Sequence, residues 1–195
     1  MHVSCFDIIL FTQLLRIRAN FHDLTSYAHV LVHLTDTNRL YRKALNSNET
    51  LYHADVLQKL ANLKGRQNKL DKACVLLEET LRIRIKKLGM KNESVAQALF
   101  SLGILFSKKS EYEASLKIFN DCLEIQQNTI GFDKIETADT LRAIGQCLGN
   151  TGEYFDAVNV WNEAYEIYSK HESGAMKLKA LKHDLELGYR LLEES

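Results

Sequence analysis

The sequence predicts an all-α fold in which antiparallel helix pairs stack into an α–α superhelix. A unit of 42 residues is repeated nearly three times between Ala54 and His171. The 195-residue chain contains no proline, so no residue lacks the backbone donor that a helix needs. A fixed period of this length is typical of repeat architectures, in which each repeat buries a face of its neighbour and does not fold alone.

The repeat is carried by alternating columns of small and bulky residues, seen when residue i is placed over i+42 and i+84. Helices approach to about 8–10 Å only where side chains are small, and bulky neighbours then fill the flanking grooves. The small columns are Ala61, Gly103 and Gly145; Ala73, Ser115 and Ala157; and Thr80, Cys122 and Ala164. The bulky columns are Leu70, Tyr112 and Tyr154, and Leu77, Phe119 and Trp161. These columns predict two packed helices in every unit.

The least regular part of the chain comes first. Residues 1–20 place apolar residues at helical spacing and favour a buried half-repeat helix. The alternatives are an amphipathic membrane or partner helix and a disordered segment. Residues 21–51 contain a degenerate repeat, visible in RLYRKAL at 39–45, where Tyr41 and Ala44 form the bulky and small pair. His29 and His33 lie one helical turn apart, but no third ligand accompanies them, so no metal site is predicted.

Three clear repeats follow, over residues 52–94, 95–136 and 137–172. In the first, Gly65 is expected to end one helix in a left-handed C-cap, and Gly89 to end the other. Gly131 occupies the same column as Gly89 in the second repeat. In the third, Trp161 falls in a bulky column, which favours a core position over an exposed binding anchor.

The C-terminal residues 173–195 predict a capping helix for the array. Leu178, Leu181, Leu185 and Leu192 approximate one helical face, with lysines on the other. Gly188 weakens a helix and predicts a kink. The alternative is the first helix of a truncated fourth repeat.

Composition excludes several classes of partner. Lys plus Arg and Asp plus Glu both number 25, so no net field attracts nucleic acid or anionic lipid. The four cysteines form no CxxC pair and no metal spacing, which favours free thiols in a reducing compartment and predicts a cytoplasmic location. The apolar stretch 3–11 lacks a basic leader and is about half the roughly 20 residues that cross a bilayer, so neither a signal peptide nor a membrane span is predicted.

The columns and two longer segments resemble the tetratricopeptide repeat family. ETLRIRIKKLG at 79–89 with SVAQAL at 94–99, and DCLEIQQNTIG at 121–131 with ETADTL at 136–141, are similar to the 42-residue repeat of kinesin light chains. The resemblance covers residues 54–170 and, more weakly, 21–50. It implies a right-handed superhelix that binds peptides on its concave face.

By this resemblance, three positions in each first helix face the groove. Phe100 and Ile104 would supply apolar anchors at its centre, with amides and cations around them to meet the backbone or carboxylate of an extended peptide. The alternative is that Phe100 and Ile104 only pack between adjacent repeats. The full set of groove candidates is Gln58, Lys59, Asn62, Phe100, Ser101, Ile104, Arg142 and Gln146.

Motifs for chemistry are missing from the sequence: it has no phosphate-binding glycine loop, no metal cluster and no nucleophile elbow. A basic run near Gly89 lies where cations favour a helix C-terminus, so phosphate contact is the weaker interpretation. The run comprises Arg82, Arg84, Lys86, Lys87 and Lys91.

The predicted function is a non-enzymatic scaffold or adaptor, without a cofactor, that binds a short peptide segment of a partner protein. The alternatives are a sensor or self-assembly module of a larger multidomain machine, or a kinesin-light-chain-like cargo adaptor. A monomer is expected, with self-association possible.

Overall fold

The computed structural model describes residues 50–194. The helix predicted over 1–20 and the pair His29 and His33 lie outside the described residues, as does all of the repeat over 21–51 except its last two positions.

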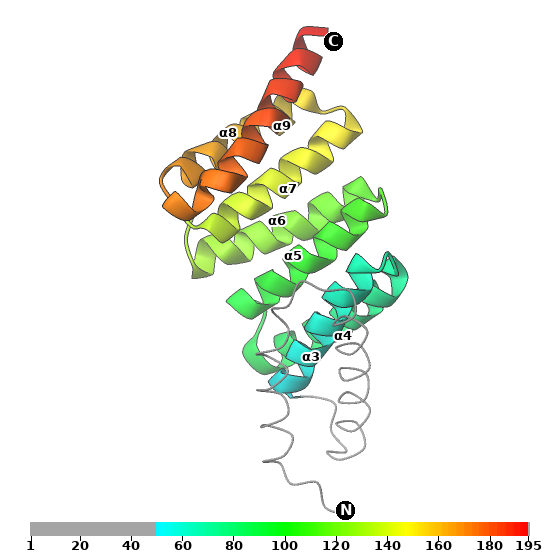
Figure 1. Ribbon diagram of the computed structural model, residues 1–195. Helices are drawn as coiled ribbons and strands as arrows, with labels where there is room; N and C mark the ends of the chain where they lie inside the picture. Colours follow the sequence, from blue (N-terminus) through cyan, green and yellow to red (C-terminus); the bar gives the residue numbers. More distant parts are fainter. Residues whose placement is uncertain (1–49, 195) are drawn as a thin grey trace, which may run out of the picture. The chain divides into compact units, whose positions relative to one another are not determined.

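The described residues form a succession of helix pairs without a strand, so the all-α prediction is confirmed. Each helix packs on the next, and α3 also contacts α5, α5 contacts α7, and α7 contacts α9 (Figure 1). The odd-numbered helices therefore lie along one side of the array. The elements are α3 (Leu51–Arg66), α4 (Leu70–Leu88), α5 (Glu93–Lys108), α6 (Tyr112–Thr129), α7 (Ile135–Thr151), α8 (Tyr154–Ser169), a short 3-10 helix (Glu172–Gly174) and α9 (Ala175–Glu194).

Local chemistry explains where several helices begin and end. The side chain of Thr50 accepts a hydrogen bond from the backbone N–H of His53 at 3.2 Å, and that of Asn92 accepts one from Ser94 at 2.9 Å. These are N-caps for α3 and α5. Gly89 follows α4 with φ 83°, a backbone conformation that favours glycine.

The prediction that Gly65 caps a helix is wrong. α3 continues to Arg66, and Asn68 adopts the positive φ of 57° in the following turn. Gly65 instead lies inside the helix, where an added Cβ would come within 2.9 Å of the side chain of Leu105. The residue is therefore small to allow α3 to approach α5 closely.

The small and bulky columns pack directly against each other. A Cβ added at Gly103 would lie 2.5 Å from the ring of Phe119, and one at Gly145 would lie 2.4 Å from the indole of Trp161. Trp161 is 6% exposed, and its Nε1–H donates to the carbonyl of Arg142 at 3.2 Å. The core position predicted for Trp161 is confirmed.

The polar members of the small columns have hydrogen-bond partners. Ser115 donates to the carbonyl of Gly103 at 2.8 Å, and Thr80 donates to that of Leu76 at 2.8 Å. Cys122 lies 3.2 Å from the carbonyl of Ala96, and burial raises the pKa of its thiol to about 11. A polar atom at these positions is tolerated because it does not lose its hydrogen bonds.

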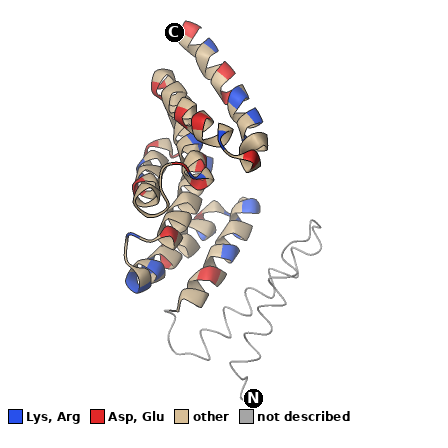
Figure 2. Ribbon diagram, turned by 90° about the vertical axis from the view of Figure 1, so that its left-hand side faces the viewer, with Lys and Arg blue, Asp and Glu red and all other residues tan. Residues whose placement is uncertain are grey.

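The C-terminal residues form the single helix α9, which packs mainly on α8. Leu181 and Leu185 are buried in this contact. Residues of both charge signs are interspersed along its length (Figure 2). The sequence predicts a kink at Gly188, and α9 is one helix that continues through that residue. A Cβ there would lie 2.7 Å from Val158 and 2.9 Å from Trp161, so the glycine allows α9 to approach α8.

Candidate functional site

A pocket of about 370 Å³ lies between the N-terminal parts of α5 and α7, beside the C-terminal end of α6. Its size is within the range of about 300–1,000 Å³ found for ligand sites. The wall combines apolar, amide and carboxylate side chains. The lining residues are Glu93, Ser94, Ala96, Gln97, Phe100, Gln126, Ile130, Glu136 and Asp139.

Phe100 is the largest apolar side chain on the pocket wall. It is partly buried and packs against two hydrophobic clusters. One cluster is formed mainly by α4, α5 and α6, and the other by α6 and α7. Its ring centroid lies 5.7 Å from that of Phe119, with the ring planes inclined by 51°. Tilted aromatic pairs at this distance attract each other. The aromatic surface that Phe100 presents to the pocket is therefore held in place by the core.

The amide of Gln126 lines the pocket and is fixed by hydrogen bonds within the protein. Gln126 is 5% exposed, its Nε2–H donates to the carbonyl of Glu136 at 3.3 Å, and its Oε1 accepts from the hydroxyl of Thr140 at 2.8 Å. These two contacts join the end of α6 to the beginning of α7. The buried amide is therefore hydrogen-bonded within the protein, as buried polar groups are in stable folds.

Three carboxylates stand around the pocket, and they differ in their partners. Asp139 accepts a hydrogen bond from the hydroxyl of Tyr168 at 2.6 Å and contacts the ammonium of Lys177 at 2.6 and 2.7 Å. Burial, followed by the Asp139 carboxylate, raises the pKa of the Tyr168 phenol. Glu93 and Glu136 lie exposed in the first turns of α5 and α7, and the described part of the chain provides neither with an ion-pair partner.

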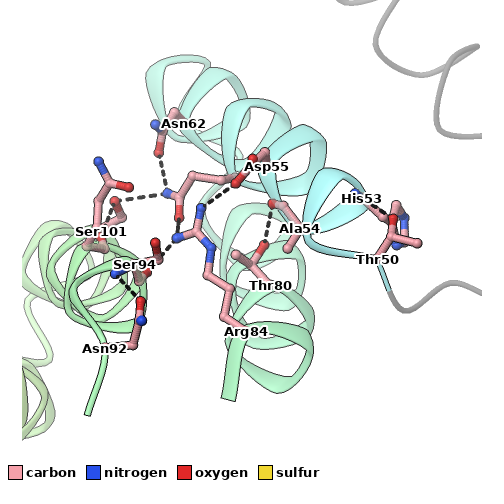
Figure 3. A network of polar contacts seen from close by, with 12 residues as sticks. Thr50, His53, Ala54, Asp55, Asn62, Thr80, Arg84, Asn92, Ser94 and Ser101 are labelled. Carbon is pink, nitrogen blue, oxygen red and sulfur yellow. Dashed lines mark hydrogen bonds and ion pairs between the residues drawn. The ribbon is translucent and has the colours of Figure 1, made fainter. Parts of the chain in front are cut away.

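In the first described repeat, Arg84 stands at the position equivalent to Gln126 of the pocket wall. Arg84 is 3% exposed and donates to the carboxylate of Asp55 at 2.9 Å and to the carbonyl of Ser94 at 2.6 Å (Figure 3). The contact with Asp55 joins the two helices of one repeat, α3 and α4. We call such a contact between the first and second helix of a repeat a polar bridge.

The third described repeat has a polar bridge at the same columns. Arg84, Gln126 and Tyr168 are separated by 42 residues, as are Asp55, Gln97 and Asp139. The hydroxyl of Tyr168 on α8 bonds Asp139 on α7, as Arg84 on α4 bonds Asp55 on α3.

The middle repeat lacks this bridge. Its two residues at the same columns, Gln97 and Gln126, both line the pocket, and no hydrogen bond joins their side chains. The pocket thus coincides with the repeat in which the polar bridge is absent.

The groove candidates on α3 serve mainly to hold helices together. Gln58 is buried, and its amide donates to Ser101 on α5 at 3.0 Å and to Asn62 at 3.2 Å, while its oxygen accepts from Arg84 at 3.3 Å. Gln58 and Ser101 therefore connect two adjacent first helices. Lys59 is exposed and does not line the pocket.

The candidates on α7 are engaged with the C-terminal helix. The guanidinium of Arg142 bonds Asp184 on α9 at 2.9 Å, and the amide of Gln146 lies 3.4 Å from the same carboxylate. Ile104 is partly buried against the cluster formed by Phe119, Ala143, Ile144 and Cys147. Of the eight candidates, the structure places only Phe100 on the pocket wall.

Sequence reasoning missed the polar residues that form the bridges, and those that stand at the same columns in the middle repeat. Arg84 was grouped with the basic run near Gly89, but it is buried and paired with Asp55. The available signal was the column itself, since Arg84, Gln126 and Tyr168 are long side chains with polar ends at identical spacing. Within the described range, no group of three metal-ligating side chains is found, and no helix is long and apolar enough to cross a membrane.

Comparison with known proteins supports the repeat assignment. Residues 49–128 match the model of the tetratricopeptide repeat family. A search among curated protein sequences gave no match.

Among the solved structures that are similar to this chain, three share 18% identity or less with it, a likeness that concerns the fold. BtubC (BKLC) from P. vanneervenii is 18% identical with a TM-score of 0.70, over 95% of this chain and 83% of that one. A putative kinesin light chain with nearly identical repeats, from Podospora anserina, is 16% identical with a TM-score of 0.77, over 99% and 90%. A single-substitution form of that protein is 15% identical to this chain with a TM-score of 0.80, over the same shares of the two chains.

Proposed function

We propose that this chain, a tetratricopeptide repeat protein with the fold of kinesin-light-chain-like repeat proteins, is a non-enzymatic scaffold that binds a short extended segment of a partner protein. Tetratricopeptide repeats generally mediate contacts between proteins, which supports the general role. The single observation that supports the specific one is the pocket between α5 and α7, with Phe100 on its wall.

The chemistry of the pocket suits a peptide. The ring of Phe100, together with Ile130, offers apolar surface for a side chain of the partner. The amide of Gln97 is exposed, and its helix lies on the side of the array formed by first helices. An extended peptide needs both kinds of contact, because apolar pockets receive its side chains and polar groups meet its backbone.

The surrounding residues support the pocket by holding its walls. Gln58 with Ser101 joins α3 to α5, and Arg142 with Asp184 joins α7 to α9. The two helices that border the pocket are thus each connected to an outer neighbour. A site with fixed walls loses less conformational entropy when a ligand binds.

A selection experiment tests this function. Peptides would be selected from a random twelve-residue phage library on the full chain, and their affinities measured by fluorescence anisotropy. We expect Phe100→Ala to weaken the selected peptides about tenfold or more, because it removes the main apolar contact. Phe155→Ala is the matched control, since Phe155 is exposed on α8 outside the pocket.

Phe100 also contacts the core, so a second variant separates binding from folding. Phe100→Gln introduces the residue that Gln58 supplies in the preceding repeat, and circular dichroism would show whether the variant is folded. Selected peptides that bind wild type and both folded Phe100 variants equally would show that this pocket is not the peptide site.

A cytoplasmic location is part of the proposal. Cys74, Cys122 and Cys147 are buried and free in the structure. Buried unpaired thiols are compatible with a reducing compartment. Fluorescence microscopy of the tagged chain in cells would test this location directly.

A further inference from the structure

The carboxylates that line the pocket make it negatively charged. No lysine or arginine lines it, whereas Glu93, Glu136 and Asp139 do. Lys177 is bound to Asp139 at 2.6 Å and neutralises that charge. Arg84 reaches the carbonyl of Ser94 nearby, but its guanidinium is paired with Asp55. Two carboxylates, those of Glu93 and Glu136, therefore remain to attract a cation.

The position of the two glutamates in first helical turns does not account for the whole arrangement. An acidic residue in a first turn stabilises its own helix by interaction with the helix dipole. That effect does not require the residue to face another element, and each of the helices α4 to α8 has an acidic residue in its first turn. Glu93 and Glu136 come from different helices and border the same pocket beside Phe100.

We infer that the pocket receives a lysine or arginine side chain from the partner segment, with its aliphatic stem on Phe100 and its cation between Glu93 and Glu136. This rests on the proposed function. Long basic side chains bury their methylene groups on apolar surface while the charged end stays in water. A cation near the face of an aromatic ring gains further attraction. The pocket offers both surfaces together.

Charge complementarity separates this occupant from others. An acidic segment, a nucleic acid or an anionic lipid would bring negative charge toward Glu93 and Glu136, which Coulomb repulsion opposes. A purely apolar segment would cover both carboxylates without supplying a partner for them, which is unfavourable. A basic side chain beside an apolar residue is the chemistry that satisfies all parts of the wall.

Two matched peptide pools test the inference on the full chain. Both are fluorescent, acetylated and amidated eight-residue pools with one fixed leucine and mixed Ser, Ala and Gly elsewhere. One pool carries a fixed lysine next to the leucine and the other a fixed glutamate. Fluorescence anisotropy at low salt is expected to show that wild type binds the lysine pool about tenfold more tightly than the glutamate pool.

Charge changes at the pocket should alter this preference. Glu93→Gln with Glu136→Gln is expected to weaken binding of the lysine pool roughly fourfold to twenty-fivefold, about twofold to fivefold for each carboxylate. Glu93→Lys with Glu136→Lys should reverse the preference in favour of the glutamate pool. The control, Glu113→Gln with Glu163→Gln, removes two exposed carboxylates outside the pocket and should leave the preference unchanged.

The outcomes distinguish this inference from the proposed function. Equal binding of the two pools, with both weakened by Phe100→Ala, would overturn the basic-residue inference and leave peptide binding intact. Binding of neither pool, or binding that ignores Phe100, would overturn both. A wild-type dimer that dissociates with Glu93→Lys and Glu136→Lys, measured by light scattering, would show that the occupant is a second copy and would also overturn the inference.

Discussion

The middle repeat and its two neighbours share a backbone plan but differ in what their second helices place against their first. In the flanking repeats, Arg84 bonds Asp55 and Tyr168 bonds Asp139. In the middle repeat, Gln97 and Gln126 stand at these positions without bonding each other, and a pocket lies there. The difference shows how one repeat can keep its helix packing without the polar bridge that its neighbours have.

The small and bulky columns show how side-chain volume is divided between facing helices. The bulky member grows along the array from Leu77 to Phe119 to Trp161, and the facing small residue changes from Ala61 to glycine. A Cβ at Gly103 or Gly145 would overlap the facing ring. From the first described repeat to the second, a larger bulky residue is therefore matched by a smaller facing residue, as close-packed interiors require.

The largest expected effect concerns the bulkiest contact. Trp161→Ala should lower the free energy of unfolding by about 3–5 kcal/mol, because it leaves a cavity beside Gly145 and Gly188 and removes the hydrogen bond to Arg142. Urea denaturation followed by circular dichroism would measure this change. A loss near zero would mean that the third repeat does not depend on its bulky column.

Exchanging side-chain volume between two facing residues tests whether the glycines are needed to make room for the aromatic rings. Gly103→Ala should cost about 1–3 kcal/mol, because its Cβ would lie 2.5 Å from Phe119. Combining it with Phe119→Leu should recover much of that loss, since the pair then matches Ala61 and Leu77 of the preceding repeat. A thermal denaturation cycle of the two single variants and the double variant measures the recovery. Additive losses would contradict the volume argument.

The polar bridge of the first repeat should contribute less. Arg84→Gln places the middle repeat's residue in the first one and should lower the free energy of unfolding by about 1–2 kcal/mol. The cost is moderate because Asp55 is 61% exposed on its side chain and returns to water when its partner is removed. Chemical denaturation would measure it, with Arg82→Gln on the exposed face of α4 as the control.

The sequence could predict the fold because the repeat signal is distributed over many residues. Leu57, Leu99 and Leu141, like the small columns, are all governed by the same helix contacts, so any one of them supports the others. Gly65 and Gly188 show the limit of that reasoning. Both were assigned to backbone effects within one helix, whereas both permit contact with another helix, which local patterns do not encode.

The candidate site was harder to predict because it depends on which polar residues pair across the fold. Phe100 is a candidate because the family resemblance places its column, with Gln58 and Arg142, in the groove. Arg142 was expected to face a ligand, but its guanidinium is bonded to the carboxylate of Asp184, 42 residues later in the chain. Glu93 and Glu136 were missed because an acidic residue at a helix start has an adequate local explanation.

The most direct test of the account is to build the missing polar bridge into the middle repeat. Gln97→Asp with Gln126→Arg copies the Asp55 and Arg84 pair, and Gln97→Asp alone serves as the control. We predict that the double variant keeps its free energy of unfolding within about 1 kcal/mol while the affinity for selected peptides, measured by fluorescence anisotropy, falls tenfold or more. A folded double variant that binds those peptides as tightly as wild type would contradict the claim that the unbridged middle repeat forms the binding site.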